Sequence, residues 1–229
     1  MPSSDPSPGE VVSGAVLGVV FDMDGVLVDS GAHHRAAWLA LLGDVGVTPP
    51  PGFWRVTIGR PAEEAVALLL GKDISPAQAR ELANRKREHY GRLARRGVVP
   101  VAGAGEFVAS VRRAGLPCAV ATSATRTDVS RLLRAVHLAG QFDAVVTADD
   151  IRFGKPNPEV YQRAAEALGV PAARCLAFED SIAGVEAACG AGMRVIGVES
   201  AHTDAVLREA GAIRSIESFE GLSWPVRLD

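Results

Sequence analysis

The stretch AVLGVVFDMDG, residues 15–25, decides the fold, because an apolar run ends there abruptly in two aspartates and a glycine. The run does not alternate with polar residues, and continuous runs of this kind are typical of strands covered on both faces. Similar runs recur further along the chain, at residues 116–122, 142–147, 175–179 and 193–198, with a weaker one near 212–216. We therefore predict a parallel sheet whose first strand ends just before Asp22.

Helical patterns lie between these runs, at residues 106–114, 127–136, 157–168 and 181–189. Three of the four end next to a glycine, the residue that most often follows the C-terminus of a helix. Strands that alternate with helices predict an α/β fold, here a doubly wound, Rossmann-like parallel sheet with helices on both faces.

The region between residues 31 and 100 breaks this alternation. It contains no convincing strand and three helix-like stretches, at residues 32–43, 61–71 and 75–96. We predict that residues 31–100 form a helical cap, inserted into an α/β catalytic core of residues 15–30 and 101–229. Residues 1–14 are rich in proline and serine, and we expect a disordered tail there.

The composition argues against several classes of protein. With 24 basic and 27 acidic residues, the formal net charge of -3 gives no electrostatic reason to expect a nucleic-acid partner. The apolar run at residues 16–21 is far shorter than the roughly 20 residues that cross a membrane, and no secretory signal is visible. We expect a cytoplasmic protein, a monomer or weak dimer, whose three cysteines, Cys118, Cys175 and Cys189, are buried thiols.

Polar side chains follow four of the predicted strands, at the sheet edge where ligands bind in open α/β folds. They are Asp22 and Asp24, then Thr122 and Ser123, then Lys155, and finally Glu179 and Asp180. Four carboxylates in one place repel one another, and Mg²⁺ removes that repulsion because it prefers oxygen ligands. An amine and a hydroxyl can then hold the oxygens of a phosphate group. The set predicts phosphoryl transfer on a small phosphate ester, with Mg²⁺ as the cofactor.

Asp22 and Asp24 divide the chemistry between them in this prediction. A carboxylate can attack phosphorus and form an aspartyl-phosphate, and a second carboxylate can give and take the proton. Residues two apart in an extended segment lie on the same side, so both side chains can face one pocket. Ser123 is the weaker candidate, because its side chain points away when that of Thr122 points in, which leaves its backbone N–H.

Four short stretches resemble the motifs of the haloacid dehalogenase superfamily. FDMDGVLVDS at residues 21–30 resembles the first motif, Thr122 after its strand the second, Gly154-Lys155-Pro156 the third, and residues 178–181 (FEDS) the fourth. Their order and spacing also match, over roughly residues 15–200. The resemblance implies Asp22 as nucleophile, Asp24 as general acid and base, and Thr122 and Lys155 as phosphate ligands. It also implies Mg²⁺ held by Asp22, by the backbone carbonyl of Asp24 and by Asp180, with Glu179 nearby.

The helical insertion is similar to the cap of phosphatases and β-phosphoglucomutases in this superfamily. His34 falls where the mutases carry a histidine near the hinge, and Arg92 about where they carry a cap lysine; Arg60 is a further candidate contact. We interpret the charged run 85–87 as a solvated helix face, with a contact to phosphate as the alternative. The expected activity is hydrolysis of a small phosphorylated metabolite, such as a sugar phosphate. A sugar-phosphate mutase, or a catalytically silent protein on this fold, remains the alternative.

Overall fold

The computed structural model describes residues 15–58, 60–71 and 73–228, so the predicted tail lies outside the described residues. Within these ranges, six strands form one sheet in the order β5-β4-β1-β6-β7-β8, and every neighbouring pair is parallel. The strands are β1 (Gly18–Phe21), β4 (Cys118–Ala121), β5 (Ala144–Val146), β6 (Cys175–Glu179), β7 (Arg194–Val198) and β8 (Arg214–Ile216). The predicted doubly wound parallel sheet is therefore confirmed.

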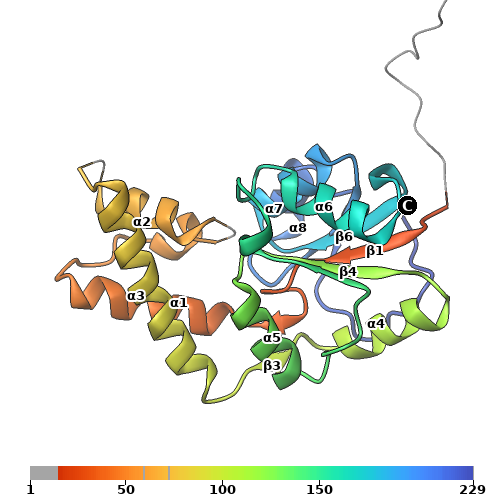
Figure 1. Cartoon of the computed structure of the whole chain (residues 1–229), viewed down its shortest axis with the longest axis horizontal. Coiled ribbons are helices and arrows are strands. Elements are labelled where there is room, and N and C mark those ends of the chain that lie inside the picture. The colour runs from red at the N-terminus through yellow and green to blue at the C-terminus, as the bar shows by residue number, and fades with distance from the viewer. Residues whose placement is uncertain (1–14, 59, 72, 229) are drawn as a thin grey trace, which may run out of the picture.

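Helices cover both faces of this sheet. In Figure 1, α4 (Ala104–Arg113) and α5 (Arg126–Ala135) lie below it, while α6 (Glu159–Leu168), α7 (Ile182–Gly190) and the short, unpredicted α8 (Asp204–Glu209) lie above. Each strand feeds two apolar clusters, because successive side chains point to opposite faces. In β1, Val19 and Phe21 pack on the α4 and α5 side, and Val20 packs on the α6 side.

Four phenylalanines fix the sheet against α4. Phe21, Phe107, Phe178 and Phe219 are fully buried, or nearly so, and their ring centroids lie 5.1–6.4 Å apart. Aromatic rings at these separations add to the stability that burial alone gives. Phe21 and Phe178 belong to the neighbouring strands β1 and β6, so this packing holds in register the two strand ends that carry Asp22 and Glu179.

Three helices, α1 (Gly31–Asp44), α2 (Ala62–Leu70) and α3 (Pro76–Ala94), pack on one another beside the sheet, and we call them the cap (Figure 1). Their own apolar cluster includes Trp38, Leu41 and Phe53. Helix α3 begins at a capping box, in which the hydroxyl of Ser75 and the side chain of Gln78 each accept the other's backbone N–H. None of the helices in the described ranges is long and apolar enough to cross a membrane.

A short ribbon connects the cap to the sheet. Strands β2 (Val28–Asp29) and β3 (Val99–Pro100) pair antiparallel, so the chain leaves and re-enters the core at one place. The prediction that residues 31–100 contain no strand is therefore wrong at Val99 and Pro100. A strand of two residues has no periodicity to detect, and its pairing depends on a partner about 70 residues away in the chain.

Candidate active site

Lys155 joins two strand ends in a buried ion pair. Its Nζ lies 2.6 Å from Oδ1 of Asp22, directly after β1, and 2.6 Å from Oε1 of Glu179, the last residue of β6. Alternation places Glu179 on the same face as Ala177, the face covered by α6. Lys155 reaches this point from the loop before α6. Three stretches that are far apart in the sequence thus meet within hydrogen-bonding distance.

The ammonium of Lys155 has further partners besides the two carboxylates. Its Nζ donates to the carbonyl of Ala121 at 3.2 Å, and it lies 3.4 Å from the hydroxyl of Tyr161 and 5.0 Å from that ring's centroid. Burial favours the neutral amine, but the attraction of Asp22 and Glu179 outweighs it and holds the pKa of Lys155 above its ordinary value. The lysine is therefore charged across the physiological range.

The neighbouring carboxylates carry more negative charge than Lys155 can neutralise. Burial raises the pKa of Asp22 to about 7, with Glu179 and Asp24 adding to the rise and Lys155 opposing it. Burial, Glu179 and Asp22 also raise the pKa of Asp180 well above its ordinary value. One oxygen from each of Asp22, Glu179 and Asp180 lies within 4.8 Å of the others. Buried oxygen donors this close together fit a hard divalent cation such as Mg²⁺.

Glu179 differs from the other two acids because hydrogen bonds occupy both of its oxygens. Oε1 accepts from Lys155 and, at 2.9 Å, from the hydroxyl of Tyr161. Oε2 accepts from the backbone N–H groups of Asp180 and Ser181 and from the Ser181 hydroxyl, at 2.9–3.0 Å. A Cβ added at Gly184 would lie 1.7 Å from Oε1, so only glycine fits beside it. These contacts suit Glu179 to holding Lys155 more than to binding a metal.

Asp180 is oriented from a strand that the sequence motifs do not include. The hydroxyl of Ser200, which follows β7, donates to Oδ2 of Asp180 at 2.9 Å. On the other side lies Gly25, whose φ is 79°, and an added Cβ there would lie 2.0 Å from the same oxygen. Gly25 is thus required both by its backbone conformation and by the closeness of Asp180. The adjacent Ser181 caps α7, with its hydroxyl 3.1 Å from the N–H of Gly184.

Asp24 has different surroundings from Asp22. Its Oδ1 accepts from the hydroxyl of Ser30 at 2.6 Å and lies 3.2 Å from Nε2 of His34 and 3.4 Å from the hydroxyl of Tyr90. Burial would raise the pKa of Asp24, but His34 and Ser30 outweigh it and lower the pKa to about 2. Asp24 is therefore ionised at neutral pH.

A buried lysine of the cap reaches the site through His34. Nζ of Lys86 lies 2.7 Å from Nδ1 of His34, and burial lowers the pKa of Lys86 to about 8. Burial, followed by Lys86, also lowers the pKa of His34. The geometry suits a neutral imidazole that accepts from Lys86 at Nδ1 and donates from Nε2 to Asp24. His34 also stacks on Tyr90, with ring centroids 4.2 Å apart.

The interpretation of residues 85–87 as a solvated face is wrong for Lys86, which is only 6% exposed. The reason is the period of α3. Its buried side includes Ala79, Ala83, Lys86, Tyr90 and Ala94, at spacings of four, three, four and four residues. This stripe can be read from the sequence once the small residues are taken as the buried side of the helix.

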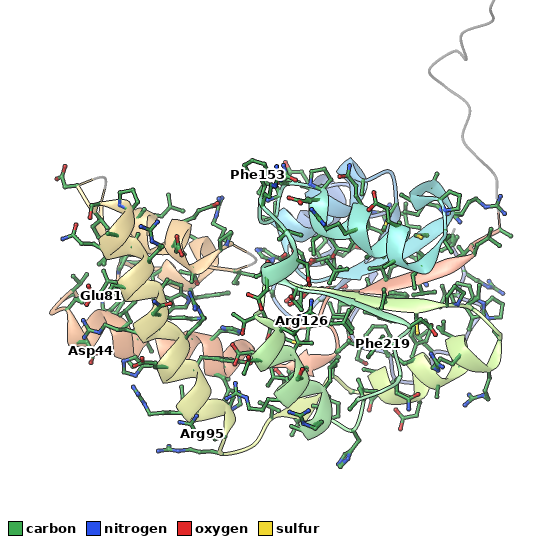
Figure 2. The ribbon with its side chains drawn as sticks, in the orientation of Figure 1. Asp44, Glu81, Arg95, Arg126, Phe153 and Phe219 are labelled. Atoms are coloured by element: carbon green, nitrogen blue, oxygen red, sulfur yellow. The ribbon has the colours of Figure 1, made fainter. Side chains whose placement is uncertain are left out.

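The structure does not bring Arg92 into the site. Arg92 is exposed, and it hydrogen-bonds Nδ1 of His89 at 2.7 Å; His89 in turn contacts Asp44 on the outer side of the cap (Figure 2). Two positions beyond Tyr90, it lies about 200° around the helix from that buried residue. The predicted contact of Arg92 with substrate therefore fails, and Lys86 is the lysine that the cap contributes.

The other predicted residues gather around one pocket of about 1200 Å³ between the core and the cap. Thr122 is buried and accepts the N–H of Ala124 at 3.1 Å, while Ser123 is exposed; both line the pocket. Exposed Arg60 also lines it. Further lining residues that were predicted are Asp22, Asp24, His34, Lys155 and Asp180. Sequence reasoning missed Ser30, Lys86, Tyr90, Tyr161 and Ser200, whose contacts depend on how distant elements pack.

Comparison with known proteins identifies the family. A family model described as haloacid dehalogenase-like hydrolase matches residues 16–192, a range that contains Asp22, Thr122, Lys155 and Asp180. The chain belongs to this family. The match confirms the family resemblance on which the predicted fold and enzyme class depend.

Members of this family that resemble the chain along most of its length are phosphatases. Validoxylamine A 7'-phosphate phosphatase of Streptomyces hygroscopicus is 32% identical over 211 residues, 90% of this chain and 95% of that protein. A phosphorylated carbohydrates phosphatase of Thermotoga maritima is 33% identical over 211 residues, 90% of this chain and 96% of that protein. The predicted class of enzyme, a phosphoric monoester hydrolase of the haloacid dehalogenase superfamily, is thereby confirmed.

A solved haloacid dehalogenase-like structure, the β-phosphoglucomutase of Clostridium difficile, has a TM-score of 0.80 and 23% sequence identity. The likeness covers 91% of this chain and 94% of that one. At this identity it supports the fold alone, and the choice between phosphatase and mutase does not follow from it.

Proposed function

We propose that the chain hydrolyses a phosphorylated carbohydrate, with the carboxylate of Asp22 as nucleophile and Mg²⁺ as cofactor. The observation that carries the proposal is the pair of buried aspartates with opposite pKa shifts, one beside the ammonium of Lys155 and the other hydrogen-bonded to Ser30 and His34. Two carboxylates whose surroundings separate their pKa values are typical of a nucleophile and a proton carrier. Relatives that act on phosphorylated sugars support the substrate class.

The cation would be held by the carboxylates of Asp22 and Asp180 and by the backbone carbonyl of Asp24. When bound, Mg²⁺ neutralises charge on the carboxylates and on the phosphate oxygens. Lys155 holds another phosphate oxygen, and Glu179 and the carbonyl of Ala121 keep its ammonium in place. The hydroxyl of Thr122 and the N–H of Ser123 complete the contacts to phosphate in this proposal.

Two displacements make up the reaction. In the first, an oxygen of Asp22 attacks phosphorus, the ester P–O bond breaks, and protonated Asp24 gives its proton to the leaving oxygen. In the second, Asp24 takes a proton from water, the water oxygen attacks phosphorus, and the bond to Asp22 breaks to release phosphate. The low pKa of Asp24 suits the second step. For the first, the nearby anionic ester must raise this pKa, as a like charge does.

Replacing the nucleophile tests this proposal. Asp22→Asn should abolish release of phosphate from sugar phosphates in the presence of Mg²⁺ and leave the far-UV circular dichroism spectrum unchanged. The matched control is Asp73→Asn, at an exposed aspartate outside the pocket, and it should turn over like the wild type. Full activity of Asp22→Asn would exclude Asp22 as the nucleophile.

The same assay separates hydrolysis from phosphoryl transfer within a sugar. With β-glucose 1-phosphate and a bisphosphate activator, hydrolysis yields free phosphate, whereas a mutase yields glucose 6-phosphate without net phosphate release. We expect free phosphate. Accumulation of glucose 6-phosphate at a matching rate would favour the mutase instead.

A further inference from the structure

An aromatic side chain of the core lies exposed at the edge of the pocket. Phe153 is 63% exposed, the most exposed of the large apolar side chains in the described residues, and it lines the pocket that contains Asp22. Figure 2 shows it at the end of the core nearest the cap. Single exposed apolar residues are common, so the position alone decides nothing, and the surroundings of Phe153 carry the argument.

The backbone that carries Phe153 is held in place. Oε2 of Glu159 accepts the backbone N–H groups of Arg152 at 2.8 Å and of Phe153 at 3.0 Å. Oε1 of the same carboxylate accepts from Arg163 at 2.7 and 2.9 Å, which fixes Glu159 one helical turn into α6. A segment fixed in this way presents its phenyl ring at a defined place, so the ring's exposure is built into the fold.

The cap touches the core directly beside this ring. A Cβ added at Gly154 would lie 2.7 Å from Cγ of Pro61, the residue before α2, so the two parts are in close contact there. Trp54 and Ile58 of the cap line the same pocket. Phe153 thus lies where the pocket is bounded by apolar groups from both sides, away from the acidic cluster at the strand ends.

Phe153 is also close to the phosphate site along the chain. It precedes Lys155 by two residues, and two residues span at most about 7 Å of extended backbone. That length is similar to the width of one sugar ring. A ring esterified to a phosphate at Lys155 would therefore extend to the level of Phe153. The C–H faces of sugar rings are apolar, and an aromatic face can pack on them.

We propose that Phe153 is a specificity-determining residue, which stacks on the ring of the leaving group and favours cyclic phosphate esters over small acyclic ones. This inference rests on the proposed function, because it assigns the leaving group of the same reaction. Phe153 contributes nothing to the attack on phosphorus. Its effect falls on the affinity for ring-bearing substrates.

The test compares two sets of phosphate esters. Glucose 6-phosphate and trehalose 6-phosphate carry rings, and acetyl phosphate and glycerol 3-phosphate do not. Phe153→Ala should lower kcat/KM about 10-fold for the ring-bearing esters, mainly through KM, because lost apolar contacts change specificity by this order. For the acyclic esters the change should stay within 2-fold. Phe153→Tyr keeps the ring and should retain the preference, and Leu68→Ala, at an exposed apolar residue outside the pocket, should alter neither set.

Equal losses on both sets would overturn the proposal, because Phe153 would then act through Lys155. The absence of any loss would overturn it as well. Binding answers the question without turnover: in the Asp22→Asn background, calorimetry should show about 10-fold weaker binding of glucose 6-phosphate after Phe153→Ala, with inorganic phosphate unaffected. If the wild type hydrolyses no ester, the proposed function fails, and this binding difference still decides for or against the role of Phe153.

Discussion

The core and the cap each contribute one buried lysine to the pocket, and the two lysines differ in what surrounds their charge. Lys155 of the core lies between two carboxylates, 2.6 Å from each, and its pKa is raised. Lys86 of the cap has a neutral imidazole as its closest partner and lies 5.3 Å from the ring centroid of Trp38, and its pKa is lowered to about 8. The core lysine is thus part of a permanent ion-pair network, while the charge of the cap lysine is poorly compensated until an anion arrives.

The largest difference should appear when each charge is removed. Lys155→Met leaves Asp22 and Glu179 buried without their partner, and breaking a buried pair from one side costs about 3–5 kcal/mol. Turnover should be lost as well. Urea denaturation monitored by fluorescence measures the free energy of unfolding. An unchanged unfolding midpoint would show that the ion pair does not hold the strand ends together.

Lys86→Met should change the stability much less, because it removes a charge whose burial is already unfavourable. We expect a change in the free energy of unfolding below about 2 kcal/mol, since only the contact with His34 is lost. The value of kcat/KM should nevertheless fall about 10- to 100-fold, the worth of one hydrogen bond from a charged donor to the substrate.

Arg92→Met is the matched control for Lys86→Met, because Arg92 lies on the same helix but points away from the pocket. Its kcat/KM should stay within 2-fold of the wild type. If Arg92→Met impaired turnover more than Lys86→Met, the assignment of Lys86 as the cap's cation in the site would be wrong.

The sequence predicted the core half of this comparison better than the cap half. Asp22, Thr122, Lys155 and Asp180 each follow a strand, and the carboxyl ends of parallel strands meet at one edge whatever the side chains around them. Lys86 stands between two arginines, and a run of three cations resembles a solvated surface. Its burial became evident only from the stripe of small residues on α3.

Contacts between distant elements were beyond sequence reasoning. Tyr161 reaches Glu179 because α6 packs on the same face of the sheet as β6, and Ser200 reaches Asp180 because β7 is the neighbour of β6. Both depend on strand order and register, which no local pattern contains. The ribbon β2–β3 was missed for the same reason, since each strand has only two residues.

The smallest predicted effect is a pH dependence that only the cap lysine should cause. Lys86, with a pKa of about 8 in place of 10.5, is charged below pH 8 and neutral above it. Its attraction for the substrate is therefore present at pH 7 and lost as the pH rises, which lowers kcat/KM by up to about 10-fold between pH 7 and 9. In Lys86→Arg the charge persists, so this decline should vanish. A decline of equal size in that variant would assign it to another group.

The central claim is that the phosphoryl group passes through Asp22, and trapping it there tests the claim most directly. Asp24→Asn removes the group that activates water, so the covalent intermediate should accumulate when this variant is mixed with substrate and Mg²⁺ and quenched in acid. Peptide mass spectrometry should then find one phosphoryl group, on Asp22. Continued turnover by the wild type with no phosphoryl group on Asp22 in either protein, and with water oxygen entering phosphate in a single displacement, would contradict the account.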